Sequence, residues 1–166
     1  MSDDLSRSVP TLTAEDLTAA VAAVFDGHIG LKFTEASTVR VRAAAVVGPE
    51  LLQRGGVVHG GVYSSIVESV ASWGATLSLE GAGYAVGVNN NTDFLRSASD
   101  GTLLAEGTPV FRGRTQQLWR VVITDAGARE CAIGQVRLHN IFQEGLHNIF
   151  KAASGEQRRV ESGVPL

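Results

Sequence analysis

Four extended runs joined by very short links fill the second half of this chain, and they constrain its fold more than any other feature. Turn-forming residues separate the runs, which cover residues 84–95, 102–111, 116–125 and 128–138. Strands joined by such short links are antiparallel neighbours, because a parallel pair needs a long crossover connection. The sequence therefore predicts one antiparallel sheet.

One long apolar segment, residues 60–79, comes before these runs. Its apolar side chains recur at about 100° per residue, the period of an α-helix that packs on one face. The stripe predicted to pack on the sheet consists of Val62, Ile66, Val70, Trp73 and Leu77. A long helix against an antiparallel sheet makes an α+β fold.

The chain before this helix predicts a further helix and two strands. Thr13 followed by two acidic residues is typical of a helix start, and Gly27 is expected to end that helix. Residues 29–34 and 39–47 have the β-branched content of strands. The expected organisation is a leader and short helix over 1–28, one domain over 29–140, and a partly disordered tail over 141–166.

A doubled pentapeptide, LHNIF, occurs at residues 138–142 and 146–150. The duplication is too short to indicate a repeat fold. It predicts either a short helix against a neighbour or a loosely held segment, and no function is assigned to it.

The composition indicates a soluble domain. The chain has 166 residues, 44% of them hydrophobic, which is enough to bury a core without disulfides. Its net charge of −3 gives no general attraction to nucleic acid or an anionic membrane. The single cysteine cannot form an internal disulfide, and no apolar run is long enough to span a bilayer. Without a secretory-type leader, a cytoplasmic protein with no nucleic-acid or membrane partner is expected.

Glu68 is the only formal charge in the long apolar segment, and its neighbours on the same helix face are small. A solvated helix face normally carries several long polar side chains, so a backbone or a ligand is expected to approach Glu68. The alternative is an ordinary exposed glutamate. A buried unpaired carboxylate is costly, and a protein that keeps one usually uses it. We favour a functional carboxylate.

The helix starts with His59, Gly60 and Gly61. The first backbone N–H groups of a helix have no partner inside it, and the helix dipole makes this end electropositive. Without Cβ atoms, the glycines let a carbonyl oxygen that gains negative charge come close. The alternatives are a flexible turn at the glycines and a His59 that only fixes the loop.

The sequence shows no pattern for a metal or cofactor. The other histidines, His28, His139 and His147, lack the spacing that would form a metal site with His59. There is no G-x-S-x-G elbow, P-loop or dinucleotide fingerprint. We expect neither a bound metal nor a cofactor.

A set of residues around the helix start resembles that of the hotdog-fold acyl-CoA thioesterases: Gln53, His59, Gly60, Gly61 and Glu68. The similarity is greatest to the PaaI-like group, which includes the 4-hydroxybenzoyl-CoA thioesterases of the glutamate-using type. The segment VGVNNNTDFLR, residues 86–96, also resembles the strand after the helix in that family. The resemblance covers roughly residues 29–138 and implies a hotdog fold, an antiparallel sheet wrapped around one long central helix.

The resemblance implies a role for each of these residues. Glu68 matches the carboxylate that attacks the thioester or activates water. Gly60 matches the helix-start amide that binds the thioester oxygen, and Gly61 adjoins it. Gln53 falls beside the reacting carbonyl and the water, and His59 matches a loop-positioning histidine.

Two further positions come from the same resemblance. Ser72, one turn beyond Glu68, falls where a hydroxyl can hold the water or the carboxylate. Gly87 falls where relatives have a residue of the partner subunit that faces the site, sometimes a serine. Because the active site of this family lies between two subunits, the resemblance implies a homodimer or homotetramer.

The predicted function is that of an acyl-CoA thioesterase, which releases a carboxylic acid and free coenzyme A. The acyl group is aryl or of medium length by analogy, and Glu68 is either the nucleophile or the general base. One rival is a non-catalytic acyl-CoA sensor, which would have no use for a desolvated carboxylate. The other is a hotdog dehydratase or hydratase, whose Asp/His acid–base pair is not found.

Coenzyme A carries phosphates that need local basic groups in a slightly acidic protein. Arg112 and Arg114, in a strand turn with Arg120 nearby, form a candidate phosphate site. The alternative is an exposed basic turn. Trp119 and Phe111 are expected in the core rather than against the acyl group.

Overall fold

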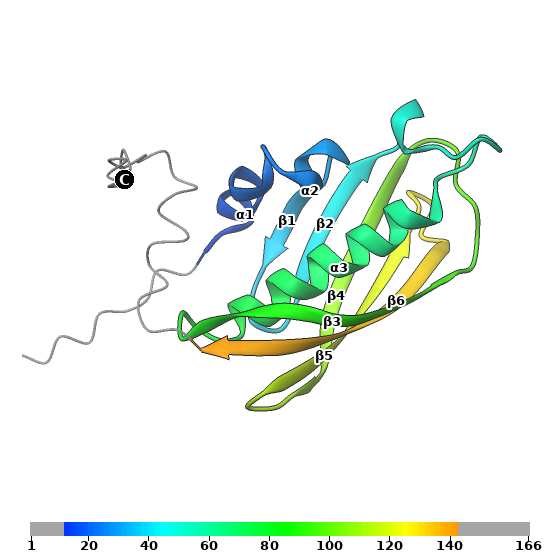
Figure 1. Cartoon of the computed structure of the whole chain (residues 1–166). Helices are drawn as coiled ribbons and strands as arrows, with labels where there is room; N and C mark the ends of the chain where they lie inside the picture. The colour runs from blue at the N-terminus through cyan, green and yellow to red at the C-terminus, as the bar shows by residue number, and fades with distance from the viewer. Residues whose placement is uncertain (1–11, 143–166) are drawn as a thin grey trace, which may run out of the picture.

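Helix α3 (Gly60–Leu77) lies against one face of a six-stranded antiparallel sheet that curves around it (Figure 1). The structure is a computed structural model and describes residues 12–142. The strands are β1 (Lys32–Ala36), β2 (Val41–Val46), β3 (Gly83–Phe94), β4 (Thr102–Arg112), β5 (Gln116–Thr124) and β6 (Glu130–Phe142). The shorter helices are α1 (Ala14–Val21), α2 (Phe25–His28) and the 3-10 turn η1 (Pro49–Leu51). The predicted α+β architecture is confirmed.

The strand order across the sheet is β1-β2-β4-β5-β6-β3, and each neighbouring pair is antiparallel. The short links after β4 and β5 join neighbours, as predicted. Strand β3 is instead carried to the far edge, where it pairs with β6. The sheet therefore ends at β3, the strand that directly follows α3.

Strand β6 is longer than predicted, because β3 offers a partner along almost its whole length. The pairing begins with Gly83 opposite Phe142 and ends with Phe94 opposite Ala132. The first LHNIF copy is therefore the end of a strand, and the prediction of a short helix or a loosely held segment is wrong there. The second copy lies outside the described residues.

The N-terminal helix begins where predicted and ends earlier. Thr13 and Asp16 form a reciprocal cap, in which each side chain accepts a hydrogen bond from the other residue's backbone N–H. Gly27 does not end this helix but lies inside α2, where a Cβ would come within 2.2 Å of the Ala22 carbonyl oxygen. Because α2 occupies residues 25–28, the next strand starts at Lys32 instead of residue 29.

The buried face of α3 is rotated by part of a turn from the predicted stripe. Ile66 and Val70 are buried as expected, whereas Val62, Trp73 and Leu77 are only partly buried. The ring of Trp73 lies edge-on to Phe33 of β1, away from the centre of the sheet. The face that meets the sheet consists of Tyr63, Ile66, Val67, Val70, Ala71, Gly74 and Ala75.

Small residues cause this rotation because they let the helix approach the sheet closely. A Cβ on Gly74 would lie 2.4 Å from the Trp119 ring. Two glycines of the sheet make similar room: a Cβ on Gly107 would lie 2.7 Å from Val70, and one on Gly134 would lie 2.5 Å from Val67.

Trp119 is fully buried, so the prediction that it belongs to the core is confirmed. Its indole N–H donates to the Gln117 side chain at 2.9 Å, which fixes the ring in place. The same prediction for Phe111 is wrong, because that ring lies near the β4–β5 turn and is 60% exposed.

A buried polar cluster ties the end of α3 to the β4–β5 turn. The Gln117 amide donates to the Ala75 carbonyl at 3.0 Å and to the Asn140 side chain at 2.9 Å. Asn140 in turn donates to the backbone carbonyls of Gly113 and Arg114. These bonds set the turn that carries the predicted phosphate site beside the C-terminal end of α3.

Within residues 12–142, no helix has both the length and the apolar character that a membrane span requires.

We predict that Gly74→Ala destabilises the protein although alanine is the better helix former. Alanine should gain up to about 1 kcal/mol in helix propensity. Forcing its methyl group into the fixed Trp119 ring should cost more, leaving the free energy of unfolding lower by roughly 1–2 kcal/mol. Urea unfolding measures the difference. The matched control is Gly55→Ala, whose Cβ would meet nothing closer than 3.5 Å. Equal or higher stability of Gly74→Ala would contradict this account of the packing.

Candidate active site

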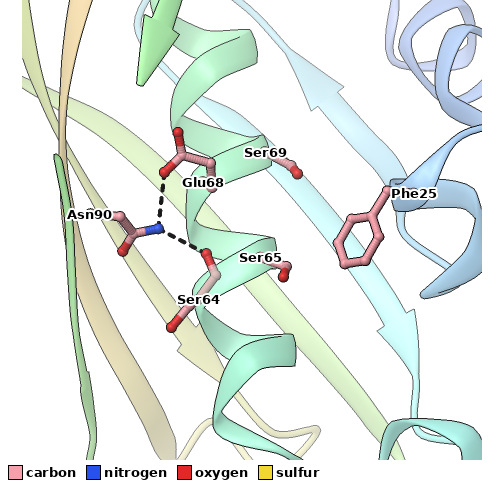
Figure 2. Close-up of a pocket in the computed structure, with 6 residues that line it drawn as sticks. All are labelled: Phe25, Ser64, Ser65, Glu68, Ser69 and Asn90. Carbon is pink, nitrogen blue, oxygen red and sulfur yellow. Dashed lines mark hydrogen bonds between the residues drawn. The ribbon is translucent and has the colours of Figure 1, made fainter. Parts of the chain in front are cut away.

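An open groove of about 290 Å³ lies along α3, between α2 and β3 (Figure 2). Its lining residues are Phe25, Ser64, Ser65, Glu68, Ser69 and Asn90. Glu68 is the only ionisable residue among them, and it is half-buried. The structure thus places the carboxylate singled out in the sequence in a groove rather than on an open face.

Asn90 of β3 holds the Glu68 side chain. Its amide nitrogen donates to Glu68 Oε2 at 3.0 Å and to the Ser64 carbonyl at 2.9 Å (Figure 2). Among residues 12–142, no Lys, Arg or His forms a salt bridge with Glu68. The carboxylate is therefore held by a neutral donor and has no cationic partner in this part of the chain.

Gly87 of β3 lies directly beside the same carboxylate. A Cβ at this position would lie 1.8 Å from Glu68 Oε1, so any side chain here would collide with it. The resemblance placed position 87 opposite the active site of a partner subunit. The structure brings Gly87 to Glu68 of its own chain, where the missing side chain makes room for the carboxylate.

A β-bulge brings Gly87 and Asn90 to the same side of the strand. Gly87 pairs with Leu138 and Asn89 with Arg137, so Val88 is the extra residue. Without the bulge, strict alternation would turn residues 87 and 89 to the same face. Sequence reasoning missed Asn90 because nothing in the sequence locates this bulge.

His59 caps α3. Its Nδ1 accepts from the Gly61 N–H at 2.9 Å, and its backbone N–H donates to the Leu51 carbonyl at 2.9 Å. His59 thus joins the preceding loop to the helix start, which agrees with a loop-positioning role. The cap occupies the Gly61 N–H. The Gly60 N–H has no acceptor within the described part of the chain.

The Phe94 ring covers Gly60. A Cβ on Gly60 would lie 2.8 Å from this ring, so glycine is required for the close approach. Phe94 itself is 56% exposed, and below it lies Tyr63, with the two ring centroids 6.0 Å apart.

Burial raises the pKa of the Tyr63 hydroxyl and that of the Cys131 thiol. Both groups are therefore protonated near neutral pH, and the thiol is not available as a nucleophile.

The predicted site residues do not all meet within one chain. Gly60 and Glu68 are eight residues apart, roughly 12 Å along the helix axis. A carbonyl within hydrogen-bond distance of one cannot also touch the other. Gln53 lies exposed in the loop before α3, and Ser72 lies half-buried one turn beyond Glu68. Two contacts join predicted site residues within the described part of the chain: His59 accepts from the Gly61 N–H, and Glu68 lies against Gly87.

The basic turn is far from the helix start. The Asn140 bonds place Arg114 beside the C-terminal end of α3, and the β4–β5 hairpin projects beyond the sheet there (Figure 1). Arg112 donates to the Thr38 carbonyl at 3.0 Å, whereas both guanidinium groups are exposed.

Helix α2 contributes a groove wall that the sequence did not predict. Ser69 donates to Asp26 Oδ1 at 2.6 Å and so ties α3 to α2. The neighbouring Phe25 is 62% exposed and lines the groove (Figure 2). The sequence gave no sign of α2, because its four residues are too few to show a helical repeat.

No three His, Cys, Asp or Glu side chains between residues 12 and 142 cluster as metal ligands would.

Comparisons with known proteins agree with this fold. Residues 55–132 match the family model described as thioesterase superfamily. The chain is 51% identical over 124 residues to the "Putative esterase Rv1847" of Mycobacterium tuberculosis, covering 73% of this chain and 89% of that protein. It is 28% identical over 120 residues to the 1,4-dihydroxy-2-naphthoyl-CoA hydrolase of Escherichia coli, covering 72% and 88%.

Solved structures show the same architecture. The structure of the mycobacterial protein superposes with a TM-score of 0.70 at 52% identity, covering 72% of this chain and 97% of that one. Thioesterase HI1161 from Haemophilus influenzae gives a TM-score of 0.77 at 28% identity, covering 81% and 94%. The chain belongs to the thioesterase superfamily: it has the hotdog fold, and it is a thioester hydrolase.

Proposed function

We propose that this protein hydrolyses an acyl-CoA thioester to a carboxylic acid and free coenzyme A, with Glu68 as the reactive carboxylate. One observation carries the proposal: the only ionisable side chain lining the groove is a half-buried carboxylate without an ion-pair partner in the described residues. The relative from Escherichia coli, named as a hydrolase of an aryl-CoA, supports the substrate class.

Two chemical routes use this carboxylate. As a general base, Glu68 takes a proton from water, the hydroxide attacks the carbonyl carbon, the C–S bond breaks, and the proton passes to the leaving thiolate. As a nucleophile, Glu68 attacks the carbonyl itself and expels the thiolate, and water then hydrolyses the mixed anhydride. Both routes need an ionised Glu68 and N–H donors at the oxygen that gains charge. Neither route needs a metal or cofactor.

The oxyanion donor comes, in this proposal, from a second copy of the chain. Gly60 has the free N–H at the positive end of α3, but it is too far from Glu68 of its own chain. A homodimer or homotetramer that sets one α3 start against the middle of another brings the two groups to one carbonyl. Gln53 and Gly61 would arrive with Gly60, because the His59 cap holds this loop to the helix start.

Strand β3 supports such an assembly. It is the edge of the sheet and is mostly exposed from Val86 to Phe94. An unpaired edge of this length is a template for pairing with another chain. Its exposed apolar side chains, Val86, Val88 and Phe94, are 39%, 50% and 56% accessible in the single chain.

We place the enzyme in the cytoplasm, where coenzyme A esters occur.

The groove suits an aryl or medium-length acyl group. Phe25 offers an aromatic wall, while Ser64, Ser65 and Ser69 on α3 form the opposite side (Figure 2). Two of these hydroxyls are already engaged, Ser65 with the Gly61 carbonyl and Ser69 with α2. Ser72 lies one turn beyond Glu68, on the side where a hydroxyl could hold the attacking water.

Replacing Glu68 by glutamine should abolish turnover and spare binding. Glutamine keeps the size of the side chain but can neither accept the proton nor attack. We expect kcat to fall at least about 1,000-fold across a panel of aryl- and alkyl-CoA esters, with ligand affinity changed little. A free-thiol assay measures release of coenzyme A.

The matched control is Glu130→Gln, an exposed glutamate at the start of β6, which should keep wild-type kcat. Wild-type turnover by Glu68→Gln would refute the proposed role of this carboxylate. A wild-type protein that binds acyl-CoA but never releases thiol would support the sensor instead.

Arg112 and Arg114 are proposed to meet the phosphates of coenzyme A. The long pantetheine arm separates the thioester from these phosphates, so a phosphate site is expected well away from Glu68. The β4–β5 hairpin lies at such a place, beyond the C-terminal end of α3. Arg114 forms no salt bridge within the described residues.

Replacing Arg114 by alanine should raise KM for an acyl-CoA but leave KM for the matching acyl-pantetheine unchanged. The truncated ester lacks the phosphates, so it cannot lose this contact. We expect the ratio of the two KM values to rise about 5- to 10-fold, as for loss of one exposed charged hydrogen bond. Arg129→Ala, at the opposite end of the sheet, is the control. An unchanged ratio would remove Arg114 from the phosphate site.

A further inference from the structure

We infer that Asn90 is a positioning residue that orients Glu68 for catalysis, and that Thr92 in turn fixes Asn90. The inference rests on the proposed function, since it assumes that Glu68 is the reactive group. It adds two residues on the edge strand to the machinery, to neither of which the resemblance assigned a role.

The hydrogen bonds define a single orientation of the Asn90 amide. The Thr92 hydroxyl donates to Asn90 Oδ1 at 2.7 Å, and Asn90 Nδ2 donates to Glu68 Oε2 and to the Ser64 carbonyl. Turning the amide over would set its oxygen against a carboxylate and a carbonyl, which is repulsive. The two acceptors therefore make Asn90 a donor to Glu68, and the Thr92 hydroxyl holds the amide in place by donating to Oδ1.

The two acceptors of Asn90 lie one helical turn apart on α3. Ser64 is four residues before Glu68, so one amide group clamps both the backbone and the reactive side chain to β3. The other carboxylate oxygen, Oε1, lies where a Cβ on residue 87 would be, so it packs against the Gly87 backbone. Strand β3 thus holds Glu68 from two directions, and the bulge at Val88 makes both contacts possible.

No other charge competes with this bond inside the groove. Helix α2 carries Asp26, which accepts from Ser69, and His28, whose ring bonds to its own helix turn. On β3 the nearest ionisable residue is Asp93, which alternation places on the opposite face from Thr92. An N–H donor to a carboxylate limits its rotation. Asn90 therefore fixes the direction of the one group that the reaction uses.

The test compares pairs of variants of nearly equal shape. Asn90→Leu keeps the branched shape and removes the donor. We expect kcat to fall roughly 10- to 100-fold, corresponding to the loss of a hydrogen bond to a charged group. KM should change little. A purely structural role for Asn90 would lower the melting temperature and leave the kcat of the folded protein unchanged.

Thr92 supplies the second pair of variants. Thr92→Val should also lower kcat, but by only about 3- to 10-fold. Thr92→Ser keeps the hydroxyl and should therefore have the wild-type kcat. The double variant Asn90→Leu/Thr92→Val should be no slower than Asn90→Leu alone, because Thr92 acts only through Asn90. Thr124→Val, on β5 and outside the groove lining, is the control with wild-type kcat.

The outcomes separate this inference from the proposed function. If Glu68→Gln is inactive while Asn90→Leu and Thr92→Val keep the wild-type kcat, Asn90 is not a positioning residue. If Glu68→Gln is itself active, the proposed function fails first. Should Asn90→Leu fold poorly, the Thr92→Val and Thr92→Ser pair decides, since equal kcat in these two would also overturn the inference.

Discussion

The close packing of α3 on the sheet is the constraint on which the rest of the structure depends. Glycine on either side of the contact, at 74 in the helix and at 107 and 134 in the sheet, leaves no room for a Cβ. Trp119, fully buried and hydrogen-bonded, fills the remaining space. This approach puts Ala71, Gly74 and Ala75 of α3 in the core and rotates the helix so that Glu68 lies beside the edge strand. The same contact that stabilises the fold therefore sets the position of the carboxylate.

The edge strand then determines what surrounds that carboxylate. Strand β3 provides Gly87, which makes room for Glu68, and Asn90, which holds it, and it does both through one bulge. The helix start lies too far along α3 to act on the same carbonyl in one chain. Each chain carries a hydrogen-bonded carboxylate in the middle of α3 and a free backbone N–H at the start of α3, next to an exposed sheet edge. Such a chain is suited to forming a site with a second copy.

The sequence predicted those features that depend on short-range patterns. Turn residues located the strands within a few positions, and the lone charge of Glu68 among small residues predicted that a backbone or a ligand approaches it. Features that depend on tertiary contacts were missed or wrong. The stripe through Trp73 was off by part of a turn, because helical period alone does not show which small residues let the sheet approach. Asn90 was missed because the alternation of a strand fails at a bulge.

Mixed oligomers provide the most direct test of the central claim, that Glu68 of one chain acts with the helix-start loop of another. Glu68→Gln and Gln53→Ala subunits, each with its own affinity tag, would be co-expressed and the mixed dimer isolated. Each variant alone should be nearly inactive. Because one of the two symmetry-related sites in the mixed dimer would be intact, the account predicts about half of the wild-type activity per dimer. A mixed dimer as inactive as its parents would place both residues in a site within one chain and contradict the account.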